Sequence, residues 1–481
     1  MKKLLTLLLA AGMVVSAANG ASAVEMKVSG SWLTSFSFTN NLYGKNALWE
    51  KNYTGGLDQH GNLKDQESGH FNAAQRIRIN FDMVASESLS GRVQLQVGQG
   101  QNFGSGKNAP GYYSWGSNGV AGPGEEVTAR LAYLDWIIPS TDVLVRMGRQ
   151  EVAMPSYTFN SPVLDDVIDG VMVSAPINDM VAVNLGWMRA DAGLSKWGEP
   201  YEAHNTRDLA YLGVDVTADG FKVSPWGMVG FAGSNTFGER KDQVIDYDDK
   251  GNLKYLDAST HYYWAGIGGE LTIFDPFRFT ADFIYGGNDA DGWGEEKGWY
   301  AALGAEMKTS FATPFVKGWY ASGDDADSKE RGALPEISGA FDASSIYFDA
   351  NGLLSPTIDN CSANSTWGVQ AGVKDVSFIE DLTHALSVTY FQGTNNTDRL
   401  TTTDWRYRTG DPLGVNYMTT ADSAWSIDFL SSYKLYQNLT ANLLLSYLIT
   451  DFDESIRPYG ADGKVKFDNA FRGTMNFTYA F

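Results

Sequence analysis

The chain ends with Ala470-Phe471-Arg472-Gly473-Thr474-Met475-Asn476-Phe477-Thr478-Tyr479-Ala480-Phe481, and its side chains alternate in kind along this stretch. Every second residue is apolar or glycine, with Phe471, Phe477, Tyr479 and Phe481 as the aromatic members. Successive side chains of a β-strand point to opposite faces, so this period of two predicts a strand. One face of that strand suits lipid and the other suits water.

The same period recurs along the whole chain. The clearest segments are 26–38, 71–83, 92–97, 277–285, 299–307, 425–433 and 439–449. Most have about the 9–11 residues that a tilted strand needs to cross a membrane. Short turns such as 218–220, 274–276 and 436–438 join some of the strands. Long polar stretches lie between the others, at 40–69, 100–126, 190–206, 235–260, 323–364 and 393–421.

Alternating short turns and long loops are typical of bacterial outer-membrane barrels. The sequence therefore predicts an all-β fold, a transmembrane antiparallel β-barrel of about 18 strands, with 16 as the alternative. A soluble sandwich is disfavoured because aromatic residues gather near many strand ends, where they would meet lipid headgroups. The composition agrees, with 13% aromatic residues, 52 Gly and a single Cys.

The first residues have the pattern of an export signal. Met1-Lys2-Lys3 precedes an apolar run from Leu4 to Val15, and Ala21-Ser22-Ala23 forms a small-residue cleavage site. We expect residues 1–23 to be a cleaved signal peptide. We expect residues 24–481 to form a single transmembrane β-barrel domain.

Charge and side-chain chemistry disfavour several other classes of protein. The formal net charge is −21, whereas nucleic-acid binding needs a basic face. The five His show no metal-ligand spacing, and no nucleophile–base pair stands out. We therefore expect no enzymatic activity, no cofactor and no metal site.

Residues 127–176 resemble part of the general trimeric porins of Gram-negative bacteria. Arg130-Leu131-Ala132-Tyr133-Leu134-Asp135-Trp136 and Val145-Arg146-Met147-Gly148-Arg149-Gln150 resemble one of their hairpins. Segment 151–169 resembles their constriction loop, and Asp169-Gly170-Val171-Met172 begins a strand like the one that follows it. Phe481 resembles the terminal aromatic residue that the outer-membrane assembly machinery reads. The layout is most similar to the homotrimeric porins of sulfate-reducing bacteria.

One departure from these porins is clear. The Pro-Glu-Phe-Gly-Gly signature of enteric constriction loops is absent from this chain. This leaves open whether segment 151–169 folds into the lumen or forms an ordinary external loop.

Charged side chains on the polar faces of the first strands are the candidate pore residues. Alternation points Lys27, Arg76, Arg78, Arg92 and Arg146 into the lumen, whereas the strand of Arg130 can be read in either register. The resemblance implies an arginine ladder, which would face Glu151, Asp165, Asp166 and Asp169 of the constriction loop. Facing charges set the ion preference of a pore. The alternative is that the arginines are solvated lumen residues or partners in salt bridges of the wall.

The function expected from these features is that of an outer-membrane porin for passive diffusion of small hydrophilic solutes and ions. Its expected partners are outer-membrane lipid and lipopolysaccharide, the assembly machinery, and further copies of itself in a homotrimer. A structural or adhesive surface protein is the alternative, followed by an outer-membrane hydrolase. Neutralising Arg76, Arg78 and Arg92 together should shift permeability toward cations.

Overall fold

The computed structural model describes residues 24–42, 69–102, 127–191, 206–233, 244–247, 253–255, 259–290, 295–326, 330–348, 362–363, 365–401, 417–456 and 467–481. The expected signal peptide, residues 1–23, lies outside these ranges. No helix among the described residues is long and apolar enough to cross a membrane.

The described residues are mostly β-strands. The first half contains β1 (Glu25–Asn40), β2 (Gly69–Ser86), β3 (Leu89–Asn102), β4 (Val127–Ile137), β5 (Leu144–Ala153), β6 (Asp165–Pro176), β7 (Val181–Asp191), β8 (Arg207–Ala218) and β9 (Phe221–Ala232). The second half contains β12 (Thr260–Leu271), β13 (Phe277–Asn288), β14 (Lys297–Met307), β15 (Thr313–Ala321), β16 (Thr366–Ile379), β17 (Leu382–Gly393), β18 (Ser423–Tyr436), β19 (Leu439–Asp451) and β20 (Ala470–Ala480). Smaller elements are β10 (Val244–Tyr247), β11 (Leu253–Tyr255), α2 (Asp398–Thr401) and the 3-10 helix η3 (Glu454–Ile456).

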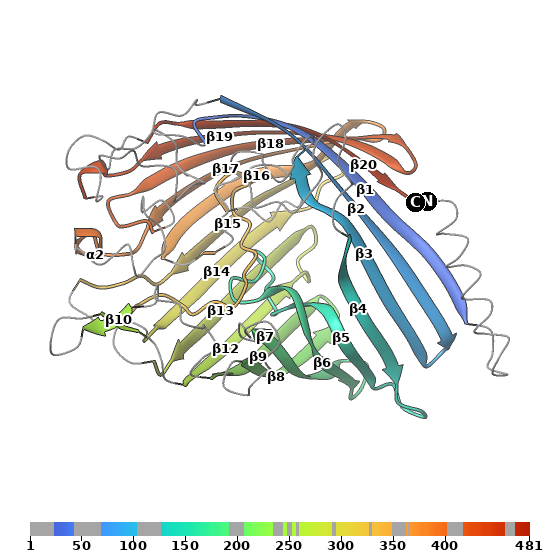
Figure 1. The fold of residues 1–481 in the computed structure, drawn as a ribbon. Helices are drawn as coiled ribbons and strands as arrows, with labels where there is room; N and C mark the ends of the chain where they lie inside the picture. Colours follow the sequence, from blue (N-terminus) through green and yellow to red (C-terminus); the bar gives the residue numbers. More distant parts are fainter. Residues whose placement is uncertain are drawn as a thin grey trace.

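These strands form one closed barrel (Figure 1). Each strand pairs antiparallel with its neighbour in sequence, β9 pairs with β12, and β20 returns to pair with β1. The hairpin of β10 and β11 stands apart from an 18-stranded sheet. The predicted all-β barrel is therefore confirmed, and of the two predicted strand counts 18 is the correct one.

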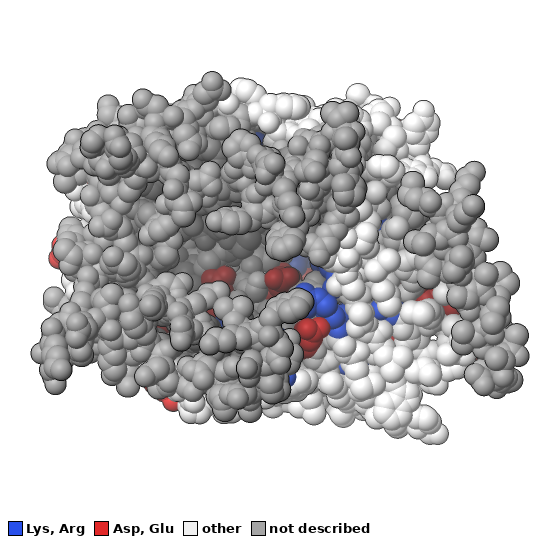
Figure 2. All heavy atoms as spheres, in the orientation of Figure 1, with Lys and Arg blue, Asp and Glu red and all other residues white. Residues whose placement is uncertain are grey.

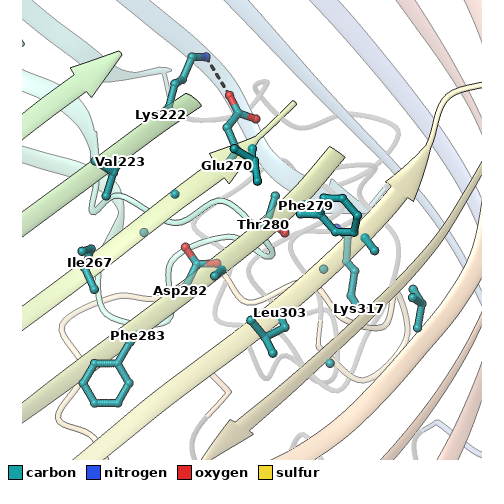
Figure 3. A pocket seen from close by; sticks show the side chains of 18 of the residues that line it. Lys222, Val223, Ile267, Glu270, Phe279, Thr280, Asp282, Phe283, Leu303 and Lys317 are labelled. Carbon is teal, nitrogen blue, oxygen red and sulfur yellow. Dashed lines mark ion pairs between the residues drawn. The ribbon is translucent and has the colours of Figure 1, made fainter. Parts of the chain in front are cut away.

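The two faces of the barrel differ as the alternation predicted. Outward side chains are large, apolar and exposed, as in Trp32, Phe283 and Leu303, the last of which is 69% exposed. Small residues such as Gly269, Ala281 and Gly318 leave a shallow apolar groove of about 950 Å³ on this outer face. Figure 3 shows this groove with Ile267, Phe283 and Leu303 along it. It suits hydrocarbon, and the polar chemistry lies on the inner face of the wall.

The seam of the barrel depends on one close approach between backbone and ring. The Gly30 N–H donates to the Phe481 carbonyl (2.8 Å), and the Phe481 N–H donates back to the Gly30 carbonyl (3.0 Å). An added Cβ on Gly30 would meet the backbone carbonyl oxygen of Arg78 on β2 most closely, and it would lie 2.6 Å from Cζ of the Phe481 ring. Only glycine fits here without moving the backbone of β2 and the Phe481 ring, and the paired backbone groups of Gly30 and Phe481 close the barrel.

A methyl group at Gly30 should therefore weaken barrel closure. We expect Gly30→Ala to cost about 1–3 kcal/mol, the usual penalty for overpacking. Semi-native electrophoresis of refolded protein should show a smaller folded fraction than wild type. Gly473→Ala on β20 is the matched control, because its added Cβ would meet neighbours only at 3.5 Å or beyond. Equal folded fractions for the two variants would contradict this role of Gly30.

Candidate functional site

The hairpin of β5 and β6 leaves the barrel wall part-way along its length. β4 pairs with β5 only as far as Arg149, and β7 pairs with β6 only from Asp169 onward. Beyond these points, residues 150–153 pair only with residues 165–168. This two-stranded extension carries loop 154–164, which contacts β9, β13 and β15 across the interior (Figure 1). The loop thus folds into the lumen, and the external-loop alternative does not hold.

The tip of this loop is fixed by two charged side chains of the far wall, one of them buried and the other half-buried. The carboxylate of Asp282 on β13 accepts the backbone N–H groups of Tyr157 and Thr158, each at 2.8 Å. Lys317 on β15 donates to the Thr158 carbonyl at 2.7 Å. Charge-assisted hydrogen bonds are roughly twice as strong as neutral ones. Asp282 and Lys317 therefore anchor the tip from both sides.

A second loop, between β15 and β16, also enters the lumen. Leu164 forms an isolated bridge with Ser338, and the Asp165 N–H donates to the Ser338 carbonyl at 2.8 Å. Ser344 then donates to Ser426 of β18 (2.8 Å), and Ser345 donates to the carboxylate of Asp428. Segment 323–364 is one of the long polar stretches, which are typical of external loops, and its described residues 330–348 correct that interpretation.

The second loop also changes the surroundings of the closing strand. The polar face of β20 was expected to meet water, but Arg472 is fully buried and donates to Ser345 at 3.2 Å and to Ser446 at 2.9 Å. The predicted outward members Phe471, Phe477, Tyr479 and Phe481 lie on the outer face. The loop therefore covers this part of the inner wall.

Aromatic packing joins the two loops to each other and to the wall. Phe159 of the first loop lies 5.0 Å from Phe341 of the second, between ring centroids, and 5.5 Å from Trp319 of β15. Phe348 packs on Phe391 of β17 at 4.9 Å. Each buried aromatic pair stabilises the fold by about 0.5–1.5 kcal/mol more than the burial of its apolar surface alone. The loops therefore form a fixed obstruction on the side of the lumen made by β13 to β20.

Arginines line the opposite side of the lumen. Arg76 and Arg78 on β2 pair in register with Leu33 and Ser31 of the inner face of β1. The Arg78 Nε donates to the Gln96 amide at 2.9 Å, an uncharged partner. Arg78 also interacts electrostatically with Arg76, Arg130 and Glu151. Figure 2 shows basic and acidic side chains close together near the middle of this view of the molecule.

A β-bulge settles the ambiguous register at Arg130. Gln94 pairs with Leu131 and Leu95 with Ala129, so Arg130 is the additional residue of β4. Its guanidinium donates to Gln94 at 3.1 Å and forms an ion pair with Glu151 at 2.6 Å. The bulge thus turns Arg130 into the lumen, where it bridges the wall and the extension.

Two of the predicted pore arginines are instead partners in wall salt bridges. Arg92 binds Asp82 through two hydrogen bonds of 2.6 and 3.1 Å. Arg146 binds Asp135 in the same way, at 2.6 and 2.8 Å. Both pairs lie inward, nearer the end of the barrel with the short turns, which we call the turn end. Because each positive charge is matched by a carboxylate, these pairs add little net field.

Lys27 pairs with Glu25 at 3.4 Å near the start of β1, and both side chains are well exposed. This pair lies at the turn end of the barrel, away from the Arg76–Arg78–Arg130 cluster. Lys27 is therefore part of the mouth of the lumen and not of its narrow part.

The predicted carboxylates divide between the extension and the wall. Glu151 and Asp165 share one face of the extension, and Asp166 accepts a hydrogen bond from Ser338 at 2.8 Å. Asp169 corrects the expectation, because it pairs in register with Arg189 on the outer face and lies 3.3 Å from Arg149. The extension ends at Ile168, and Asp169 is the first residue of β6 that pairs within the wall, so it has the outward register of the wall.

The predicted pore residues did not include a row of inward charges on β9 to β16. Glu270 contacts Lys222 at 3.0 Å, a pair marked in Figure 3, and Arg278 at 2.7 Å. Glu306 continues the row to Lys374 at 2.8 Å. These residues also alternate with apolar neighbours, and that signal could have identified them. No cluster of three metal-binding side chains occurs within the described ranges.

Comparison with known proteins gives a likeness of fold. No protein-family model and no curated protein matches the chain. Among solved structures, Pseudomonas aeruginosa OccK9 (OpdG) is similar, with a TM-score of 0.52 at 12% identity, and OccK2 (OpdF) has 0.52 at 10%. P. aeruginosa OpdK, solved with vanillate, has a TM-score of 0.51 at 10% sequence identity. Each alignment covers 95% of this chain and 98% of the other. The chain has their fold.

Proposed function

We propose that this chain is a porin that forms a water-filled channel for passive diffusion of small hydrophilic solutes and ions. The observation that carries the proposal is a closed barrel with an apolar outer face and two loops docked inside it. A closed barrel has no unpaired strand edge, so it can cross hydrocarbon without exposing backbone groups. The inner loops narrow the lumen and give it selectivity.

Selectivity follows from charges that face each other across the narrow part. Arg76, Arg78 and Arg130 line one side, and Glu151 with Asp165 faces them from the extension. Such a transverse arrangement orients polar solutes and disfavours apolar ones, because charged walls hold ordered water. This cluster replaces the longer predicted ladder, since Arg92 and Arg146 are paired within the wall.

Location and assembly are part of the same proposal. The similar solved structures are outer-membrane porins of Pseudomonas, which supports an outer-membrane location and a Gram-negative porin. Cleavage of residues 1–23, insertion by the assembly machinery and contact with lipopolysaccharide belong to this proposal. A homotrimer is proposed only on the resemblance of segment 127–176 to trimeric porins. Mass photometry of the purified protein in detergent should give three times the chain mass. A single-chain mass would refute the trimer and leave the channel untouched.

Solute entry into vesicles tests the channel itself. Liposomes containing the purified, refolded protein should swell in small neutral sugars, and the rate should fall steeply as the sugar grows. The fall is expected because two docked loops obstruct the lumen. Protein-free liposomes are the control. Vesicles that stay sealed although the barrel is folded would refute a diffusion channel.

A further inference from the structure

A recess opens from the lumen between the β5–β6 extension and the wall of β5 to β8. Its volume is about 340 Å³, within the range of small-molecule sites. The roof is apolar and is formed by Val152, Met154 and Pro155 of the extension and the loop. The floor is mixed, and its polar members are Arg146, Ser174, Asn184, Tyr211 and Asp215. We call this space the turn-end recess.

The charge of the recess depends on Asp215. Arg146 is matched by Asp135, and Glu151 by Arg130, so those charges cancel. Asp215 accepts hydrogen bonds from the Asn184 amide and the Ser224 hydroxyl, each at 2.6 Å, and both donors are neutral. Within the described residues, no cation pairs with Asp215. The recess therefore carries one uncompensated negative charge.

The two hydrogen bonds also orient the carboxylate. Ser224 gives its only hydroxyl hydrogen to Asp215, so Tyr157 must be the donor in the 2.8 Å contact between their oxygens. Asn184 occupies the other oxygen of Asp215. A carboxylate has about four acceptor positions, and these contacts use two of them. The remaining positions are available for a donor in the recess.

We propose that the turn-end recess binds a small solute carrying a protonated amine on a short aliphatic chain. The ammonium group would donate to Asp215, and the aliphatic part would lie against Val152 and Met154. An ammonium has three N–H donors, which suit the open acceptor positions of a fixed carboxylate. The recess lies on the route of the proposed channel, so this inference rests on the proposed function.

Block of single-channel current tests the proposal. The probes are n-butylammonium, which has N–H donors, and tetramethylammonium, which has the same charge and none. Wild type should be blocked at a lower concentration by n-butylammonium. Asp215→Asn should raise the half-blocking concentration of n-butylammonium about tenfold, the loss expected for one charge-assisted hydrogen bond. Its effect on tetramethylammonium should be small.

The matched control is Asp82→Asn, which removes one lumen carboxylate on β2 outside the recess. If the two variants raise the half-blocking concentration of n-butylammonium equally, the effect comes from net charge alone and the proposal is overturned. Equal block of wild type by n-butylammonium and tetramethylammonium would also overturn it. If Asp215→Asn does not fold, Ser174→Asp is measured instead. This variant adds a carboxylate to the floor of the recess, so it should lower the half-blocking concentration of n-butylammonium. An unchanged half-blocking concentration would overturn the proposal. A wild type without conductance would instead refute the channel.

Discussion

Replacing Arg76, Arg78 and Arg130 together by glutamine should move the reversal potential strongly toward cation preference. The electrostatic interaction energy between one guanidinium and an ion that passes at about 4–8 Å is roughly 0.5–1 kcal/mol in water-like surroundings. Losing three charges should change the ratio of chloride to potassium permeability about tenfold or more. The loss of Arg130 adds to the effect because it also frees the carboxylate of Glu151. The measurement is the zero-current potential across a planar bilayer with a salt gradient.

The control for this triple variant is Arg149→Gln, which removes a guanidinium from the outer face of the wall. Its reversal potential should equal that of wild type. The double variant Arg92→Gln/Asp82→Asn should also change little, because it deletes a matched pair. A triple variant with the wild-type potential would show that these arginines do not face the ion path.

Replacing Asp282 by alanine should release the first loop from the far wall. The substitution removes the two charge-assisted hydrogen bonds to the backbone of Tyr157 and Thr158. Each such bond contributes about 1.5–3 kcal/mol, so the ratio of docked to undocked loop should fall by at least about a hundredfold. The expected result is a larger and noisier single-channel conductance.

Asp289→Asn is the matched control for the loop variant. Asp289 accepts from His261 at 2.7 Å at an exposed position beyond β13, so its loss leaves the loop anchor intact. Its conductance should be that of wild type. If Asp282→Ala folds and conducts like wild type, the carboxylate does not hold the loop in place.

The sequence predicted the barrel because alternation is a local property of each strand. The inward register of Arg76, Arg78, Arg92 and Arg146 could be read in the same way, since a strand fixes the face of every second residue. Arg130 could not be placed, because a β-bulge adds one residue and ends the alternation.

What the sequence did not show are contacts between distant segments. Asp282, which accepts from the backbone of Tyr157 and Thr158, lies 125 and 124 residues away from them, and no local pattern encodes that distance. Asp169 follows Asp165 closely in the sequence, yet it lies in the wall because the extension ends one residue before it, at Ile168. The sequence does contain one sign that the second loop packs inside the barrel. Phe341, Tyr347 and Phe348 are large aromatic residues within a polar stretch, and all three are buried.

Single-channel conductance of the purified protein tests the central claim most directly. A variant lacking residues 155–162 of the first loop is measured beside wild type. A water-filled lumen narrowed by docked loops predicts discrete, ohmic steps for wild type and clearly larger steps for the shortened variant. A folded wild type that gives no steps, or steps of equal size in both proteins, would contradict it.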